Sequence, residues 1–320
     1  MSEQIKIAID AMGGENAPLK NLEGIDLFLK KNKNSDVIFQ VYGNKNTIEE
    51  ILKKKGISSN KIQVYNCSSV ISDEETPLTA IKNSKDSSMW NSVNAQIVNK
   101  ANISLSAGNT GVLFVISRMI LKTIDGVSKP ALAGLWPNKK GMNVVLDLGA
   151  NIECDENNLV DFSEMGSALY KSLFLNASPK VALLNIGSEE IKGTDSLKKA
   201  NSLLKEISKN GDFIYNGYIE GNKITEGNSN VIVTDGFTGN IALKTAEGTA
   251  KFITSSLKNS LTNLSQFWPV FKDMLTASEI GDAPKSDLFQ ISTHGGRPSP
   301  ATAIKLGSSN SEQSGALTRI

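Results

Sequence analysis

The sequence predicts an α/β protein built on a mainly parallel β-sheet with helices on both faces. Short, mostly apolar runs rich in β-branched residues alternate with longer segments of helical periodicity. Continuous apolar strands are typical of parallel sheets, because both faces of such a sheet are buried. The predicted strands are residues 5–10, 37–43, 61–65, 103–108, 143–149, 181–187 and 231–236.

The composition is that of a globular protein without a strong global charge. The 320 residues are 39% hydrophobic, which is enough for a large core in one large domain or two small ones. Lys and Arg total 34 against 33 Asp and Glu, so the formal net charge is +1. No global field therefore draws this protein to nucleic acid.

Cysteine and histidine are too few for a usual metal site or a disulfide framework. The chain contains Cys67, Cys154 and a single histidine, His294. The first residues mix charged and apolar types, and no apolar run reaches about 18 residues, the length that a membrane span needs. These features predict a cytoplasmic protein. Cys154 is expected to be a small buried thiol, and a role as catalytic nucleophile is disfavoured.

Glycines and polar residues follow several of the predicted strands. In parallel α/β sheets, ligands bind beyond the carboxyl ends of the strands. Backbone N–H groups of such loops, close to helix N-termini, could converge on one anion, although any single loop could equally be a tight turn. The loops are residues 10–14, 106–111, 147–151, 185–187 and 235–240.

The residue inventory favours a reaction in which the substrate supplies the nucleophile. His294 is the only histidine and no GxSxG elbow occurs, so covalent catalysis by the protein is poorly supported. Phosphate dianion can attack a thioester if the protein holds the phosphate and stabilises the oxyanion. Lys85 and Lys192 are the preferred charge partners. Surface salt bridges are an equal alternative for the other basic residues near the loops, Arg118, Lys122 and Lys244.

The C-terminal third begins with the longest helical pattern and ends in a polar segment. Residues 239–264 are periodic, and Phe267, Trp268 and Phe271 lie at helical spacing beyond them. Packing on the core or on a second subunit is favoured over a membrane surface for this stripe. We expect a catalytic domain over residues 1–295, with a hairpin tip at about 256–280, and a disordered tail over 296–320.

The strings at these loops resemble, in order and spacing, the phosphate acyltransferase PlsX family over roughly residues 5–284. Alone each string is modest, and together they are highly specific. The strings are DAMGG at 10–14, KDSSM at 85–89, SAGNTG at 106–111, DLGAN at 147–151, LLNIG at 183–187, EEIKG at 189–193, IEG at 219–221 and DGFTGN at 235–240.

The resemblance implies acyl-acyl carrier protein:phosphate acyltransferase activity in phospholipid synthesis, without a metal or organic cofactor. It implies a Rossmann-like three-layer α/β/α sandwich with an extended helical hairpin, and a homodimer. A peripheral link to the inner membrane face is also implied, where a downstream glycerol-3-phosphate acyltransferase uses the product. The hairpin would contact the membrane or the dimer partner, which gives Phe267, Trp268 and Phe271 a functional role.

Family positions carried onto this chain define the candidate site. We assign Asn109 as oxyanion donor, Lys192 and Lys85 as charge partners, and residues 106–111 as the phosphate cradle, with Asp10 among the catalytic residues. The positions expected to bind phosphate or the other substrate are Gly13, Gly14, Ser106, Gly108, Thr110, Gly111, Asn151, Asp235 and Asn240.

The chain departs from the family pattern at Glu15, at Tyr218 and, most extensively, after Pro284. Three alternatives to the acyl carrier protein reaction are considered on the same scaffold. A phosphate acetyl- or butyryltransferase would use coenzyme A and need no carrier-protein surface. A metal- and NAD-dependent dehydrogenase on the same scaffold would want a GxGxxG motif, which is not found. A non-catalytic module that binds carrier protein or acyl phosphate would keep the fold without turnover.

Overall fold

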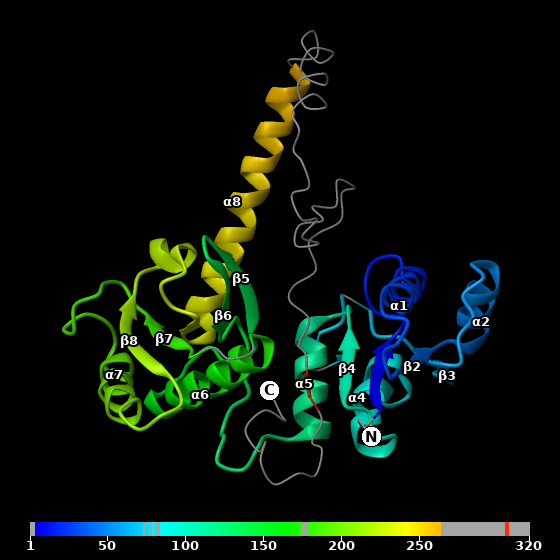
Figure 1. Ribbon diagram of the computed structural model, residues 1–320, viewed down its shortest axis with the longest axis horizontal. Coiled ribbons are helices and arrows are strands. Elements are labelled where there is room, and N and C mark those ends of the chain that lie inside the picture. The colour runs from blue at the N-terminus through cyan, green and yellow to red at the C-terminus, as the bar shows by residue number, and fades with distance from the viewer. Residues whose placement is uncertain are drawn as a thin grey trace. The chain divides into compact units, whose positions relative to one another are not determined.

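The computed structural model describes residues 4–72, 74–76, 79–80, 84–174, 178–263 and 305–306. It forms two five-stranded sheets, both mainly parallel (Figure 1). Contacts divide the chain into one compact unit, residues 1–239 with 299–320, and a second unit, residues 240–298. The predicted α/β class is confirmed. The sequence predicted one sheet, whereas the structure has two. The first four predicted strands pair in one sheet and the last three in the other.

The first sheet has the strand order β10-β4-β1-β2-β3. Strands β4, β1, β2 and β3 are parallel, and β10 pairs antiparallel with β4 through Lys305 and Ser104. Lys305 and Leu306 belong to the segment predicted as a disordered tail, and the other residues of 296–320 lie outside the described ones. The strand bounds are β1 Ile5–Asp10, β2 Val37–Gly43, β3 Ile62–Asn66, β4 Ile103–Ser106 and β10 Lys305–Leu306.

Helices cover both faces of this sheet. Ile9 and Val41 on one face pack with Leu22 of α1 and Ile48 of α2. On the other face Ala8, Tyr42 and Cys67 pack with Ala95 of α4. This alternation follows the period of two along a strand. The helices of this part are α1 Leu19–Lys31, α2 Lys45–Lys54, the 3-10 turn η1 Ser84–Asp86, α4 Ser88–Val98 and α5 Thr110–Leu121.

The second sheet has the order β5-β6-β9-β7-β8. β5 is antiparallel to β6, and the other pairs are parallel. β5 and β8 were not among the predicted strands. The bounds are β5 Gly134–Asn138, β6 Gly141–Leu146, β7 Lys180–Leu184, β8 Ile214–Ile219, β9 Val231–Val233, α6 Glu156–Leu173, α7 Asp195–Ile207 and the 3-10 turn η2 Gly221–Glu226.

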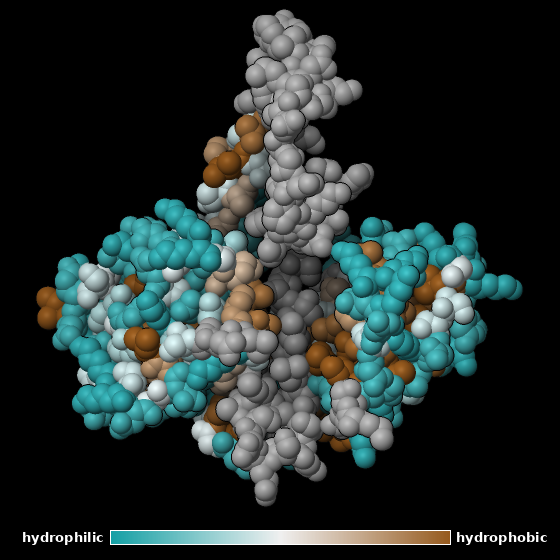
Figure 2. Space-filling view, in the orientation of Figure 1, coloured by the Kyte–Doolittle hydropathy of each residue, from teal (hydrophilic) through white to brown (hydrophobic). Residues whose placement is uncertain are grey.

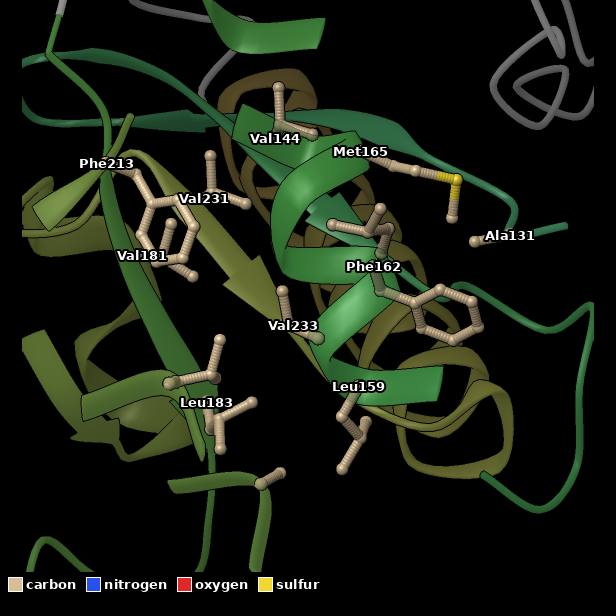
Figure 3. Close-up of a cluster of buried hydrophobic side chains, with 13 residues drawn as sticks. Ala131, Val144, Leu159, Phe162, Met165, Val181, Leu183, Phe213, Val231 and Val233 are labelled. Atoms are coloured by element: carbon tan, nitrogen blue, oxygen red, sulfur yellow. The ribbon is translucent and has the colours of Figure 1, made fainter. Parts of the chain in front are cut away.

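Helix α6 supplies the core over the second sheet (Figure 3). Leu159, Phe162 and Met165 recur at helical spacing and face the valines and leucines of β6, β9 and β7. Gly166 brings the helix close, because a Cβ there would lie 2.5 Å from Val231 Cγ1. A capping box between Asp155 and Asn158 begins the helix. The position of β6 and β9 is therefore fixed by close packing.

Helix α8, Gly236–Asn263, corresponds to the long helix that the periodicity predicts. Phe252, Ile253 and Leu257 are exposed on it, and Figure 2 shows apolar residues on its upper part. Phe267, Trp268 and Phe271 lie outside the described residues, as does most of the predicted tip. In the part of the chain described, no helix is both long and apolar enough to cross a membrane.

Candidate active site

The first cluster of predicted site residues forms where β1 and β4 end side by side. Asp10 and Ser106 are register partners in the parallel ladder, and both are buried. Ser106 Oγ donates to Asp10 Oδ2 at 2.7 Å, and the Met12 N–H donates to Asp10 Oδ1 at 3.2 Å. Burial raises the pKa of Asp10, while hydrogen bonds from the Ser88 and Ser106 hydroxyls and from backbone N–H groups oppose that rise.

Glycines let the loops after β1 and β4 touch. A Cβ on Gly13 would lie 2.6 Å from Asp10 Oδ2 and 2.8 Å from the Gly108 nitrogen. Gly14 has φ +95°, in the left-handed region that favours glycine. Asn21 Nδ2 donates to the carbonyls of Ala11 at 2.8 Å and Gly13 at 3.0 Å, which ties the first loop to α1. The two loops are therefore in close contact at the end of β1 and β4.

The N-terminus of α5 opens at this surface. Asn109 caps the helix, since its Oδ1 accepts from the Val112 N–H at 3.1 Å, and its Nδ2 donates to the Glu75 carbonyl at 3.0 Å. The Gly108 N–H donates to Ser106 Oγ at 3.1 Å. Thr110 and Gly111 form the first turn, where N–H groups have no partner inside the helix. These first-turn groups are the donors that can meet an anion.

The second cluster is organised by Asp147, which follows β6 and is fully buried. Its Oδ1 accepts from the N–H groups of Leu132 at 3.1 Å, Gly149 at 3.1 Å and Ala150 at 2.9 Å. Its Oδ2 accepts from both the backbone N and the side-chain Nδ2 of Asn151, each at 2.8 Å. One carboxylate thus fixes the whole DLGAN loop.

The start of α8 packs directly on that loop. The Gly236 N–H donates to the Asn151 carbonyl at 2.8 Å. A Cβ on Gly236 would lie 2.5 Å from the same carbonyl oxygen, and a Cβ on Gly239 would overlap the Asp147 carbonyl. Asp235 caps α8, because its two oxygens accept from the Thr238 N–H and hydroxyl, both at 2.8 Å. Asp235 therefore has a structural role in this cluster.

Lys192 lies in the loop after β7, beside the same sheet. Asn185 shapes this loop, since its Nδ2 donates to the Lys192 carbonyl at 3.1 Å and its Oδ1 accepts from the Ile186 N–H at 2.9 Å. Lys192 Nζ pairs with Glu189 at 2.8 Å, and that hydrogen bond raises the pKa of Lys192. Lys192 therefore carries its positive charge at neutral pH.

The predicted site residues are thus distributed over two clusters. Asp10, Ser106 and the glycines of both loops form the first, with the start of α5; Asn151 and Asp235 belong to the second. Lys85 is exposed in η1, and Asn240 is exposed on α8. The five strand-end loops follow strands of two sheets, residues 10–14 and 106–111 on the first and residues 147–151, 185–187 and 235–240 on the second, and a shared anion pocket stays a prediction.

Sequence reasoning did not select several residues that hold these clusters together. They are Asn21, Ser88, Asp147 and Asn185, all polar residues with little exposed surface or with several hydrogen bonds. Asp147 and Asn185 carried a usable signal, because each directly ends a continuous apolar strand and precedes a glycine. Ser88 lies within the KDSSM string of residues 85–89 without having been assigned a role, and Asn21 stands inside a helical pattern and gave no such signal.

Cys154 does not carry an activated thiol. Burial, followed by the charge of Asp147, raises the pKa of Cys154 to about 11. At neutral pH the group is therefore a thiol, which agrees with the expected structural role. Among the residues described, no group of three or more His, Cys, Asp or Glu side chains is arranged to hold a metal ion.

The fold is that of the phosphotransacetylases. EutD phosphotransacetylase from Staphylococcus aureus aligns with a TM-score of 0.56 at 16% identity, covering 78% of this chain and 83% of that one. A phosphotransacetylase from Streptococcus pyogenes aligns with a TM-score of 0.57 at 15% identity, with the same coverage of 78% and 83%. At these identities the likeness shows the fold alone.

Sequence comparison places the chain more closely. Residues 5–272 match the family described as "Fatty acid synthesis protein", and the chain belongs to this family. A phosphate acyltransferase from Pelagibacter ubique (strain HTCC1062) is 51% identical over 262 residues, which cover 82% of this chain and 77% of the relative. A phosphate acyltransferase from Caulobacter vibrioides is 38% identical over 320 residues, covering 96% and 88%.

Proposed function

We propose that this protein transfers a fatty acyl group from acyl-acyl carrier protein to inorganic phosphate. The protein is an acyltransferase of the fatty acid synthesis protein family, and relatives that carry the name phosphate acyltransferase align over most of its length. The observation that carries the proposal is the first cluster, where the start of α5 presents N–H donors beside the touching loops of β1 and β4. This arrangement suits an anion.

The reaction needs no nucleophile from the protein. A phosphate oxygen attacks the thioester carbonyl carbon, the carbon–sulfur bond breaks, and the products are an acyl phosphate and the carrier thiolate, which takes a proton. In this proposal phosphate sits at the first turn of α5, on the N–H groups of Thr110 and Gly111. The bound position of phosphate relative to the thioester supplies most of the rate.

The residues proposed to balance charge and to stabilise the oxyanion include some that already have partners within the protein, such as Lys192 and Asn109. Lys192 and Lys85 balance phosphate charge in this proposal, and Lys192 would exchange Glu189 for the substrate. Asn109 Nδ2 donates to the Glu75 carbonyl at 3.0 Å, and in this proposal the same amide group also donates to the oxyanion. Asp10 acts through the loops it holds, because its carboxylate is buried beneath them. The first-turn amides therefore carry more of the proposed binding than the side chains do.

Release of carrier thiol tests the function. Purified protein is given palmitoyl-acyl carrier protein with and without phosphate, and in parallel palmitoyl-coenzyme A and acetyl-coenzyme A. We expect phosphate-dependent thiol release with the carrier protein, with the acyl phosphate trapped as a hydroxamate by hydroxylamine. Faster release from a coenzyme A thioester would indicate a phosphate acetyl- or butyryltransferase type of reaction. Binding of acyl-carrier protein without any release would indicate a non-catalytic module.

Assembly and location belong to the same proposal. We propose a homodimer that associates with the inner membrane face, where the acyl phosphate is passed to a glycerol-3-phosphate acyltransferase. The exposed apolar residues Phe252, Ile253 and Leu257 of α8 support a surface that needs covering. Sedimentation tests the dimer, and flotation with anionic vesicles tests the membrane contact. A protein that sediments as a monomer and does not float with the vesicles would contradict both parts of this proposal.

A further inference from the structure

The hydrogen bonds of Asn151 determine which way its side-chain amide points. Its Nδ2 carries two protons, and both have acceptors: the Pro130 carbonyl at 2.7 Å and Asp147 Oδ2 at 2.8 Å. The reversed orientation would place Oδ1 against a carbonyl and a carboxylate, where it would be repelled. The amide nitrogen therefore faces inward and Oδ1 faces away from Asp147.

The other polar atoms of Asn151 are also used. Its backbone N–H donates to Asp147 Oδ2 at 2.8 Å, and its carbonyl accepts from the Gly236 N–H at 2.8 Å. Within the described part of the chain, no residue donates to Asn151 Oδ1. What this half-buried side chain offers a ligand is thus an acceptor. Hydrogen phosphate dianion presents three acceptor oxygens and a single hydroxyl donor, so Asn151 Oδ1 matches only one of its four oxygens and suits a donor-bearing ligand better than the phosphate-binding role that the sequence suggested.

A second observation concerns the same sheet edge. Among the residues described, the three most exposed large apolar side chains are Ile191 at 82%, Ile186 at 81% and Ile152 at 74%. Ile152 follows β6, and the other two follow β7. Phe237, which is 59% exposed, follows β9, the strand between β6 and β7. Since neighbouring strands lie about 4.8 Å apart, the segments that carry these side chains begin side by side at the carboxyl edge that also holds Asn151.

We infer that this edge binds the amide-containing arm of the acyl donor, with Asn151 Oδ1 accepting a hydrogen bond from an arm N–H. The inference rests on the proposed function. Thioester donors of acyl transfer hold the acyl group on an arm of methylene and amide groups, which needs both an apolar surface and an acceptor. Asp147 is a positioning residue here, because its carboxylate fixes the amide of Asn151. Phosphate is left to the other cluster, at the start of α5.

The test replaces one N–H in the donor. Octanoyl thioesters are made with N-acetylcysteamine, which has the amide, and with O-acetyl-2-mercaptoethanol, in which an ester oxygen replaces the N–H. With wild-type protein and saturating phosphate, we expect kcat/KM to be about 3- to 10-fold higher for the amide donor, the effect of one neutral hydrogen bond. Asn151→Ala should bring the ratio to about 1 while KM for phosphate stays unchanged.

A matched variant controls for loss of packing. Asn158→Ala removes a neighbouring amide that donates to Ser128 Oγ at 2.8 Å, and the amide-to-ester ratio should persist in it. Equal kcat/KM for both donors in the wild type would overturn the inference without any variant. A raised KM for phosphate in Asn151→Ala, with the ratio kept, would also overturn it and assign Asn151 to phosphate.

The inference and the proposed function fail in different ways. Acyl transfer to phosphate with equal kcat/KM for the amide and ester donors would overturn only the inference about Asn151. If no donor is turned over, the proposed function fails, and the inference is then decided by calorimetry with unreactive thioether analogues of both arms. Tighter binding of the amide analogue to wild type, lost in Asn151→Ala, would support the acceptor role. Equal binding would contradict it.

Discussion

Gly13→Ala is the sharpest test of the contact between the loops after β1 and β4. The backbone of Gly13 does not have a positive φ, so alanine is permitted there by its own conformation. Its new Cβ, however, would lie 2.8 Å from the Gly108 nitrogen and 2.6 Å from Asp10 Oδ2. The substitution therefore acts through the neighbouring loop.

The expected shift follows from the contact distance. Ordinary van der Waals contact begins at about 3.4 Å, so the Gly108 backbone must retreat by roughly 0.6 Å, carrying the start of α5 with it. A misplacement of about 1 Å can cost on the order of 100-fold in rate. We therefore expect kcat/KM for acyl transfer to phosphate to fall by about 10- to 100-fold, with most of the fold intact.

The assay is phosphate-dependent thiol release, measured beside thermal unfolding. Gly24→Ala is the matched control, because no atom lies within 4 Å of a Cβ at that position in α1. It should keep the wild-type rate. A rate for Gly13→Ala within about threefold of wild type, in a normally folded protein, would refute the claim that loop contact positions the start of α5.

Other expected outcomes test packing and protonation. Gly166→Ala should lower the free energy of unfolding by about 1–3 kcal/mol in urea, because its Cβ would lie 2.5 Å from Val231 Cγ1. A stabilising effect of Gly166→Ala would contradict the close packing of α6. Gly24→Ala should instead raise the free energy of unfolding by about 0.5–1 kcal/mol. Alkylation of Cys154 by iodoacetamide should be slow at pH 7 and accelerate about tenfold per pH unit toward its pKa of about 11. Fast alkylation at pH 7 would show an activated thiolate. Phe162→Ala should cost about 3–5 kcal/mol in the same urea titration, and a loss below about 1 kcal/mol would contradict its place in the core.

Local sequence pattern predicted the strands that carry the site well. Residues 5–10 and 37–43 coincide with β1 and β2, because continuous apolar runs bounded by polar turns leave little ambiguity. β5 and β8 were not predicted, for a physical reason. β5 contains Trp136, Pro137 and Asn138 at a sheet edge, and β8 is only partly buried, so neither is continuously apolar. The division into two sheets depends on long-range pairing, which periodicity does not encode.

The candidate site was predicted in its loops but less well in its contacts. Glycine-rich loops after strands did identify both clusters, since such positions need close backbone approach. The direction of each side chain could not be predicted. Asn109 and Asp235 cap helices, and Asn151 turns its amide nitrogen toward Asp147. A polar residue at a loop can serve the ligand or the loop itself, and only the partners within hydrogen-bond distance distinguish the two.

Both clusters use a buried aspartate at the end of a parallel strand, and this shared device explains which atoms remain for substrate. Asp147 gathers N–H donors from the loop that follows it, and Asp10 gathers the Ser106 hydroxyl and the Met12 N–H. Each carboxylate satisfies the donors nearest to it, so those donors are unavailable to an anion. The groups left over differ between the clusters: first-turn N–H groups of α5 in one, and a carbonyl-type acceptor on Asn151 in the other. In the proposed reaction, the anion would meet the first-turn N–H groups of α5 and the thioester arm would meet the Asn151 acceptor, so each substrate has a chemically matched group.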